Sequence, residues 1–171
     1  MKKICFLIVT ALVFISFSHS KNLNFQVIQN NPGQEDVFQM SLVFEQALAD
    51  FFFESGHIVS NSPVYITKGD SQADKAELKR ALVETLLGSM DVLIRLEVSF
   101  IPEKANSPEV YVLESIKNVK WSNYNAKNGQ LISTGEASPG TVDPQDNSES
   151  GVYNFASLVA SKISSTLKKG I

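Results

Sequence analysis

The chain has 171 residues, of which 43% are hydrophobic and 19% charged, and its formal net charge is −3. This length suits one domain with its own core, and the slight acidity argues against nucleic acids and anionic membrane surfaces, which favour clustered Lys and Arg. The only cysteine is Cys5, so we expect neither a disulfide framework nor a metal site built on thiolates.

The first twenty residues predict a secretory signal peptide. A positive start precedes the apolar run Ile4–Phe17, and small residues follow at 18–20. The run of 14 residues is short for a membrane span, which needs about 20. We therefore expect residues 1–20 to be removed. Residues 21–171 would then form a single exported α/β domain, periplasmic or secreted, with a formal charge of −5 and no later transmembrane span.

The first half of that domain alternates strands with helices. Residues 22–29 alternate apolar and polar side chains, which predicts a strand. Over residues 35–55 apolar side chains recur every three or four positions, which predicts an amphipathic helix. Residues 57–60 and 64–67 are short and partly β-branched, and they flank Pro63. They predict a second strand with an edge piece after the proline.

A second helix is predicted over residues 71–87. At its start, Ser71 and Asp74 resemble a capping box in which Asp replaces the usual Glu. Gly88 is suited to end the helix. The expected inner stripe consists of Leu78, Leu82 and Leu86, flanked by Ala81 and Val83.

The second half is richer in consecutive strands. Residues 92–100 alternate clearly and predict a strand. Residues 109–124 predict a long strand whose apolar side chains change side, so we expect a bulge between residues 114 and 117. Asn128–Gly129 predicts a hairpin turn, because both residue types tolerate positive φ, and residues 130–137 form the return strand.

A long loop at residues 138–151 and a final amphipathic helix from Val152 complete the pattern. The expected fold class is α/β (α+β), a two-layer arrangement of a mixed four- to five-stranded sheet with about three helices on one face. The sheet face that carries Arg95 and Glu97 would then be relatively free.

No catalytic, cofactor-binding or metal-binding motif stands out in the sequence. His57 is the only histidine after the signal peptide, and no nucleophile elbow surrounds the neighbouring serine. Asp143, Asp146 and Glu149 are spaced by three in the long loop, but they lack the alternation of a calcium-binding loop. The ordinary interpretation is therefore a structural histidine and a hydrated loop, with calcium binding left open.

Several side chains are candidates for contact with a partner. Arg95 and Glu97 share one strand face and suit either a binding groove or an exposed ion pair. Phe53 follows two other phenylalanines, and because consecutive helical residues point about 100° apart, not all three can face one sheet. Trp121 and Tyr124 are amphipathic and lie near the hairpin, where they suit recognition or ordinary sheet packing.

A family resemblance rests on five parts of the chain: Asp91–Ile94, Val119–Trp121, Gly129–Ile132, Gly135 and the closing helix. These parts resemble the α/β domain of the TolB amino-terminal region, which is similar to domains in the curli secretion lipoprotein and in lipoprotein activators of penicillin-binding proteins. The resemblance spans about residues 22–168 and implies a non-enzymatic envelope protein that docks onto other proteins. The chain lacks the lipid-bearing cysteine of the lipoprotein members.

The leading hypothesis is therefore an exported, non-enzymatic protein-binding or assembly module with no cofactor. Its expected partner is another envelope protein, since no convergent polar pocket can be identified from the sequence. Two alternatives stay open. One is a secreted hydrolase that uses His57 or residues of the acidic loop, and the other is a carrier of a small apolar ligand held between the sheet and the Phe-rich helix.

Overall fold

The computed structural model describes residues 20–30, 35–101 and 113–169. The predicted signal peptide, residues 1–20, lies outside these ranges except for its last residue, and so does the start of the strand predicted at 109–124. Within the described ranges, no helix combines the length and apolar character needed to cross a bilayer. The helices are α1 (Glu35–Glu54), α2 (Ser71–Leu87) and α4 (Glu149–Lys169). The strands are β1 (Asn22–Asn30), β2 (Ile58–Asn61), β3 (Tyr65–Ile66), β4 (Val92–Phe100), β5 (Ile116–Asn125) and β6 (Leu131–Ala137).

The strands form one mixed sheet in the order β2-β1-β4-β5-β6, with β3 also paired to β1. β1 runs parallel to β2, β3 and β4, because helical crossovers separate these strands along the chain. β4, β5 and β6 pair antiparallel, and the turn at Asn128–Gly129 joins the last two, with Gly129 at a φ of 69°. The α/β class, the three helices, the mixed sheet and the predicted hairpin are confirmed.

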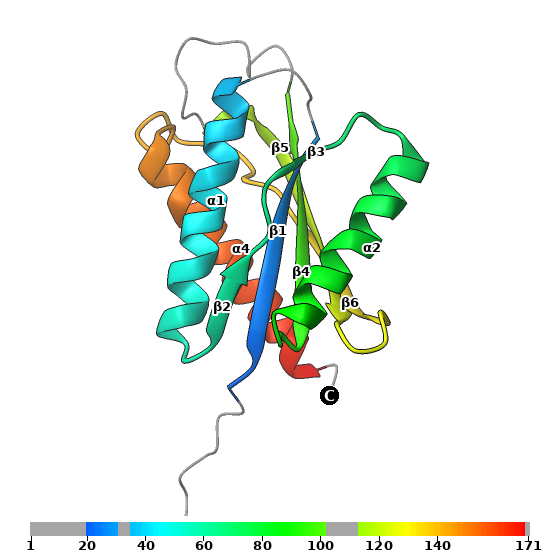
Figure 1. Ribbon diagram of the computed structural model, residues 1–171. Coiled ribbons are helices and arrows are strands. Elements are labelled where there is room, and N and C mark those ends of the chain that lie inside the picture. Colours follow the sequence, from blue (N-terminus) through cyan, green and yellow to red (C-terminus); the bar gives the residue numbers. More distant parts are fainter. Residues whose placement is uncertain (1–19, 31–34, 102–112, 170–171) are drawn as a thin grey trace, which may run out of the picture.

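The apolar core lies between the sheet and the layer formed by α1 and α4 (Figure 1). From β1, the side chains of Leu23, Phe25 and Val27 enter this core, and all three are buried. Across the helical layer, the rings of Phe44 and Phe155 meet edge to face with 6.2 Å between their centroids. The sheet, α1 and α4 therefore make the two-layer arrangement that the amphipathic patterns predict.

α2 lies against the opposite face of the sheet (Figure 1). The chain moves from β1 to β2 in one direction across the sheet, and from β3 past β1 to β4 in the other. Because parallel crossovers are right-handed in about 98% of cases, two crossovers in opposite directions place their helices on opposite faces. The predicted placement of all three helices on one face thus holds for α1 and α4, whereas α2 covers the side with Arg95 and Glu97.

α2 also buries a different stripe from the predicted one. Its buried residues are Ala81 and Thr85, while Leu78 and Leu82 are partly buried and Leu86 is 49% exposed. No residue of α2 belongs to the described apolar core. The leucine periodicity predicted the helix correctly, but the buried stripe is centred on Thr85 and on Ala81, which was predicted only as a flank, because Thr85 bonds to the sheet.

Of two local signals, the helix cap differs in detail and the strand bulge is confirmed. The residue that caps α2 is Asp70 rather than Ser71, since its carboxylate accepts hydrogen bonds from the N–H groups of Gln72 (2.8 Å) and Ala73 (3.3 Å). The predicted bulge is present: the pairing of β4 with β5 shifts between Ser99–Asn118 and Phe100–Ile116, which leaves Lys117 as the extra residue. A short 3-10 turn at Leu113–Ser115 precedes β5. The helix cap and the start of β5 are local features, and neither changes the order of the strands.

Candidate functional site

A polar network attaches α2 to the sheet. On β1, Asn24 donates from Nδ2 to the hydroxyl oxygens of Ser62 (3.1 Å) and Thr85 (2.8 Å), and its Oδ1 accepts from Ser60 (2.9 Å). The Thr85 hydroxyl in turn donates to the carbonyl of Ala81 at 2.6 Å. Asn24, Ser62 and Thr85 are buried, and the network satisfies them without water.

A second, charged network continues along the same face. Gln26 on β1 donates from Nε2 to Glu77 at 2.6 Å and accepts at Oε1 from Arg95 Nε at 3.1 Å. On α2, Arg80 donates from Nε to Glu77 at 2.8 Å and also pairs with Glu84. The hydrogen bond from Arg80 lowers the pKa of Glu77 and the same bond raises the pKa of Arg80. This chain of contacts links the outer surface of α2 to the centre of the sheet.

Arg95 and Glu97, the pair singled out in the sequence, both line a small polar cavity beside α2. Among the described residues no ion pair is recorded between them, so the ordinary explanation as an exposed pair does not describe them. Burial lowers the pKa of Arg95, and the nearby carboxylates of Glu77 and Asp74 act in the opposite direction. Arg95 is therefore a partly buried cation inside a polar layer.

Of the three predicted partner-contact residues, Phe53 lies on the surface. It is 70% exposed at the carboxyl end of α1. Other exposed apolar side chains occupy the same end of the molecule, because the Ile58 N–H bonds to the Lys21 carbonyl and the Asn22 side chain bonds to the Ser89 carbonyl just after α2. We call this group the basal patch; it consists of Phe53, Ile58, Leu86 and Leu87.

Trp121, by contrast, is a core residue. It is 4% exposed and belongs to the cluster enclosed by α1 and α4. Its ring covers Gly135 on β6, where an added Cβ would lie 2.1 Å from the Trp121 Cζ2 atom. Trp121 therefore offers no surface to a partner in this structure, and Gly135 is explained by the close approach of the ring.

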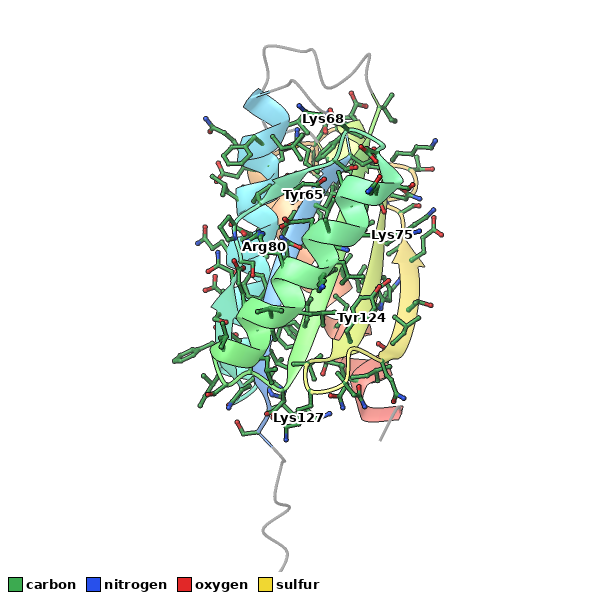
Figure 2. All side chains as sticks on the ribbon, turned by 45° about the vertical axis from the view of Figure 1, so that its right-hand side comes forward. Tyr65, Lys68, Lys75, Arg80, Tyr124 and Lys127 are labelled. Carbon is green, nitrogen blue, oxygen red and sulfur yellow. The ribbon has the colours of Figure 1, made fainter. Side chains whose placement is uncertain are left out.

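Tyr124 lies on the α2 side of the sheet, with Leu93 opposite it on β4. Figure 2 shows it on one side of α2, with Tyr65 and Arg80 on the other. Tyr124 is partly buried. It flanks the polar network around Arg95 and lies on a different part of the molecule from Phe53, so the predicted candidates do not form one surface.

The side chains weighed for catalysis have structural contacts. His57 accepts at Nδ1 from the Lys21 N–H (3.2 Å), and its ring meets Phe52 edge to face. Asp143 accepts from the Gln145 N–H at 2.9 Å and so shapes its own loop. Figure 1 shows the α1–β2 turn and the β6–α4 loop at opposite ends of the molecule. In the part of the chain that the structure describes, no three acidic, His or Cys side chains are grouped to hold a metal ion.

Sequence reasoning missed the polar residues that bind α2. Asn24 and Gln26 alternate with apolar residues along β1, a pattern from which we predicted only the strand itself. A usable signal was present, because both are neutral amides, whereas a solvent-facing strand side more often carries Lys or Glu. Neutral amides on a strand suit buried hydrogen bonds to a covering helix.

Comparison with known proteins places the chain in a family and shows similar folds. A family model described as "Uncharacterised protein" matches residues 22–168. No curated protein matches the chain.

Three solved structures resemble the overall fold. A PelC dodecamer from Paraburkholderia phytofirmans aligns over 86% of this chain and 89% of its own, with 10% identity and a TM-score of 0.45. A second crystal form of that protein covers 86% and 87%, with 11% identity and a TM-score of 0.42. Lipoprotein GNA1162 from Neisseria meningitidis covers 82% and 96%, with 16% identity and a TM-score of 0.40. At these identities the likeness is one of fold alone.

Proposed function

The chain belongs to the family of uncharacterised proteins matched over residues 22–168, and we propose that it acts by binding. In this proposal it is an exported, non-enzymatic module that docks onto another protein of the cell envelope. The basal patch is the surface that carries the interaction.

The main support is the exposure of large apolar side chains at one end of the molecule. Phe53 and Leu87 are 70% and 80% exposed, and Ile58 is 59% exposed. Single exposed apolar residues are ordinary, but several gathered at one end of a small domain are typical of interaction sites. Aromatic side chains such as Phe53 are enriched at the centres of protein interfaces.

Export is supported by the sequence of residues 1–20, which lie almost wholly outside the described part of the chain. The resemblance to the TolB amino-terminal domain group points in the same direction, since those domains dock onto other envelope proteins. The first argument concerns the location of the protein, and the second also concerns the class of its binding partner.

The two alternatives receive less support from the geometry. A hydrolase that used His57 or the acidic loop would need a catalytic partner beside either, but His57 and Asp143 each accept a hydrogen bond from a backbone N–H, and their segments lie at opposite ends of the molecule. A carrier would need space beside the Phe-rich face of α1, but Phe44 and Phe52 are fully buried there among core side chains. The basal patch is therefore the surface to test first.

Site-specific photo-crosslinking in the exported full chain tests the proposal. A photoreactive residue in place of Phe53 should give one discrete adduct with another envelope protein, identified by mass spectrometry. Changing Leu86 and Leu87 together to serine should reduce the adduct strongly, because it removes apolar area from the same end.

A matched control uses Leu158 on α4, which is 52% exposed but lies away from the basal patch. The same photoreactive residue at that position should leave the chain monomeric. Monomer alone from position 53, equal adducts from both positions, or an adduct of two copies of this chain would each contradict docking onto a different envelope protein through this patch.

A further inference from the structure

A polar cavity of about 230 Å³ lies on the α2 face, at the end of the molecule opposite the basal patch. Its floor comes from the carboxyl halves of β1 and β4, and its walls come from the segment after β3 and the first turn of α2. This volume exceeds the roughly 30 Å³ of one water molecule several times and lies just below the range of about 300–1,000 Å³ for drug-sized ligands. The cavity therefore suits a small organic molecule.

The position of the cavity follows from the winding of the sheet. The crossover through α1 runs one way from β1, and the crossover through α2 passes β1 the other way to β4, so the connections diverge between β1 and β4 (Figure 1). In open α/β sheets, ligands bind outside the carboxyl ends of the strands at such a switch point. Asn30 at the end of β1, Thr67 after β3 and Glu97 on β4 line the cavity at this point.

Arg95 supplies the cationic part of the lining. A guanidinium group has five N–H donors, and Arg95 uses Nε on Gln26. In the described part of the chain, neither Nη atom has a recorded hydrogen bond or ion pair. The two Nη groups of Arg95 lie in one plane, and together they match the two oxygens of a carboxylate.

Asp74 and Glu97 supply the anionic part. Asp74 Oδ1 accepts from the hydroxyls of Tyr65 (3.0 Å) and Thr67 (2.8 Å), and Glu97 Oε1 accepts from Asn30 Nδ2 (2.7 Å). One oxygen of each carboxylate is thus held in place, and the other has no recorded hydrogen bond among the described residues. Two such oxygens suit an ammonium group, which has three donors and no acceptor.

We propose that this cavity binds a small zwitterion of the α-amino acid class, with its carboxylate on Arg95 and its ammonium group between Asp74 and Glu97. The lining carries one positive and two negative side chains, which disfavours phosphate and other dianions. A cation without a carboxylate would leave the Arg95 terminal nitrogens unpaired. The proposal goes beyond the proposed docking function and uses different residues.

Isothermal titration calorimetry of the purified exported protein tests this site. Each of the common α-amino acids is titrated in turn, with acetate and methylammonium as half-ligands. At least one amino acid should bind with a dissociation constant below about 1 mM, and both half-ligands should bind more weakly. Glu97→Gln, which keeps the shape of the side chain, and Arg95→Met should each weaken binding by about tenfold or more.

Lys79→Met is the matched control, because Lys79 is an exposed cation on α2 that does not line the cavity, and it should leave the affinity unchanged. Circular dichroism confirms that each variant is folded, and Glu97→Gln carries the test if Arg95→Met fails to fold. The proposal would be overturned if no amino acid bound with a dissociation constant below about 1 mM, if acetate bound with equal affinity, or if Lys79→Met caused an equal loss. None of these results would alter crosslinking from position 53, so the two proposals fail separately.

Discussion

The two faces of the central strand β1 are buried to a similar degree but are held by different forces. Along β1, Leu23 and Phe25 enter the apolar core, while Asn24 and Gln26 face α2, and all four are at most 4% exposed. On the first face the covering helices bury apolar area, and this burial is stabilising whatever the orientation of the side chains. On the second face α2 is held by hydrogen bonds, which need a particular partner at a particular distance.

This difference changes how each face responds to mutation. A truncated core side chain loses buried apolar area and leaves a cavity. A truncated polar side chain leaves its former partner buried without a hydrogen bond, a cost that disappears when both partners are replaced together. The comparison predicts that mutations on the α1–α4 face cause large, additive losses of unfolding free energy. Mutations on the α2 face should cause smaller losses that are coupled between partners.

The largest effect is expected for Phe44→Ala. Phe44 is fully buried and contacts Phe155, so the free energy of unfolding should fall by about 3–5 kcal/mol. Urea denaturation measures the change. Phe53→Ala is the matched control on the same helix, and because Phe53 is 70% exposed, its effect should stay within about 0.5 kcal/mol. Equal losses from the two variants would contradict the assignment of the core.

An intermediate effect is expected for Thr85→Val, which keeps the shape of the side chain but removes the hydroxyl. Asn24 then loses its 2.8 Å bond, and the free energy of unfolding should fall by about 1–3 kcal/mol. Asn24→Leu combined with Thr85→Val should cost clearly less than the sum of the two single changes. Strict additivity in this double-mutant cycle would refute the hydrogen-bonded attachment of α2.

The smallest effect concerns the pH dependence of Glu77. Its folded pKa is lowered by the hydrogen bond from Arg80, so its contribution is present above the unfolded pKa of about 4.3 and is lost as the pH falls through the lowered folded value. Because Arg80 is 44% exposed, solvent screens the pair and the contribution should stay below about 1 kcal/mol.

Urea denaturation at a series of pH values measures this contribution. Above the unfolded pKa, wild type should be slightly more stable than Glu77→Gln, and the difference should vanish in acid. A constant difference at all pH values would show that the ionised Glu77 carboxylate is not what stabilises α2.

The fold was predictable where the signal was local. Residues 35–55 and 71–87 show apolar spacing of three and four, and the structure has helices at Glu35–Glu54 and Ser71–Leu87. Asn128–Gly129 predicted its hairpin because the turn needs positive φ, which Gly129 adopts. The candidate site was harder to predict from the sequence. Only Arg95 and Glu97 of the cavity lining were singled out, and nothing in the sequence indicated that α2 covers them.

The sequence by itself determined the type and order of the elements, because hydrophobic periodicity and turn chemistry act between residues a few positions apart. Only the tertiary structure decided which face α2 covers, since that depends on the direction of two crossovers and on hydrogen bonds between residues about sixty positions apart, such as Asn24 and Thr85. Alternating polar residues on a strand give the same sequence pattern whether water or a helix supplies their hydrogen bonds. The buried polar layer could therefore be identified only from the tertiary structure.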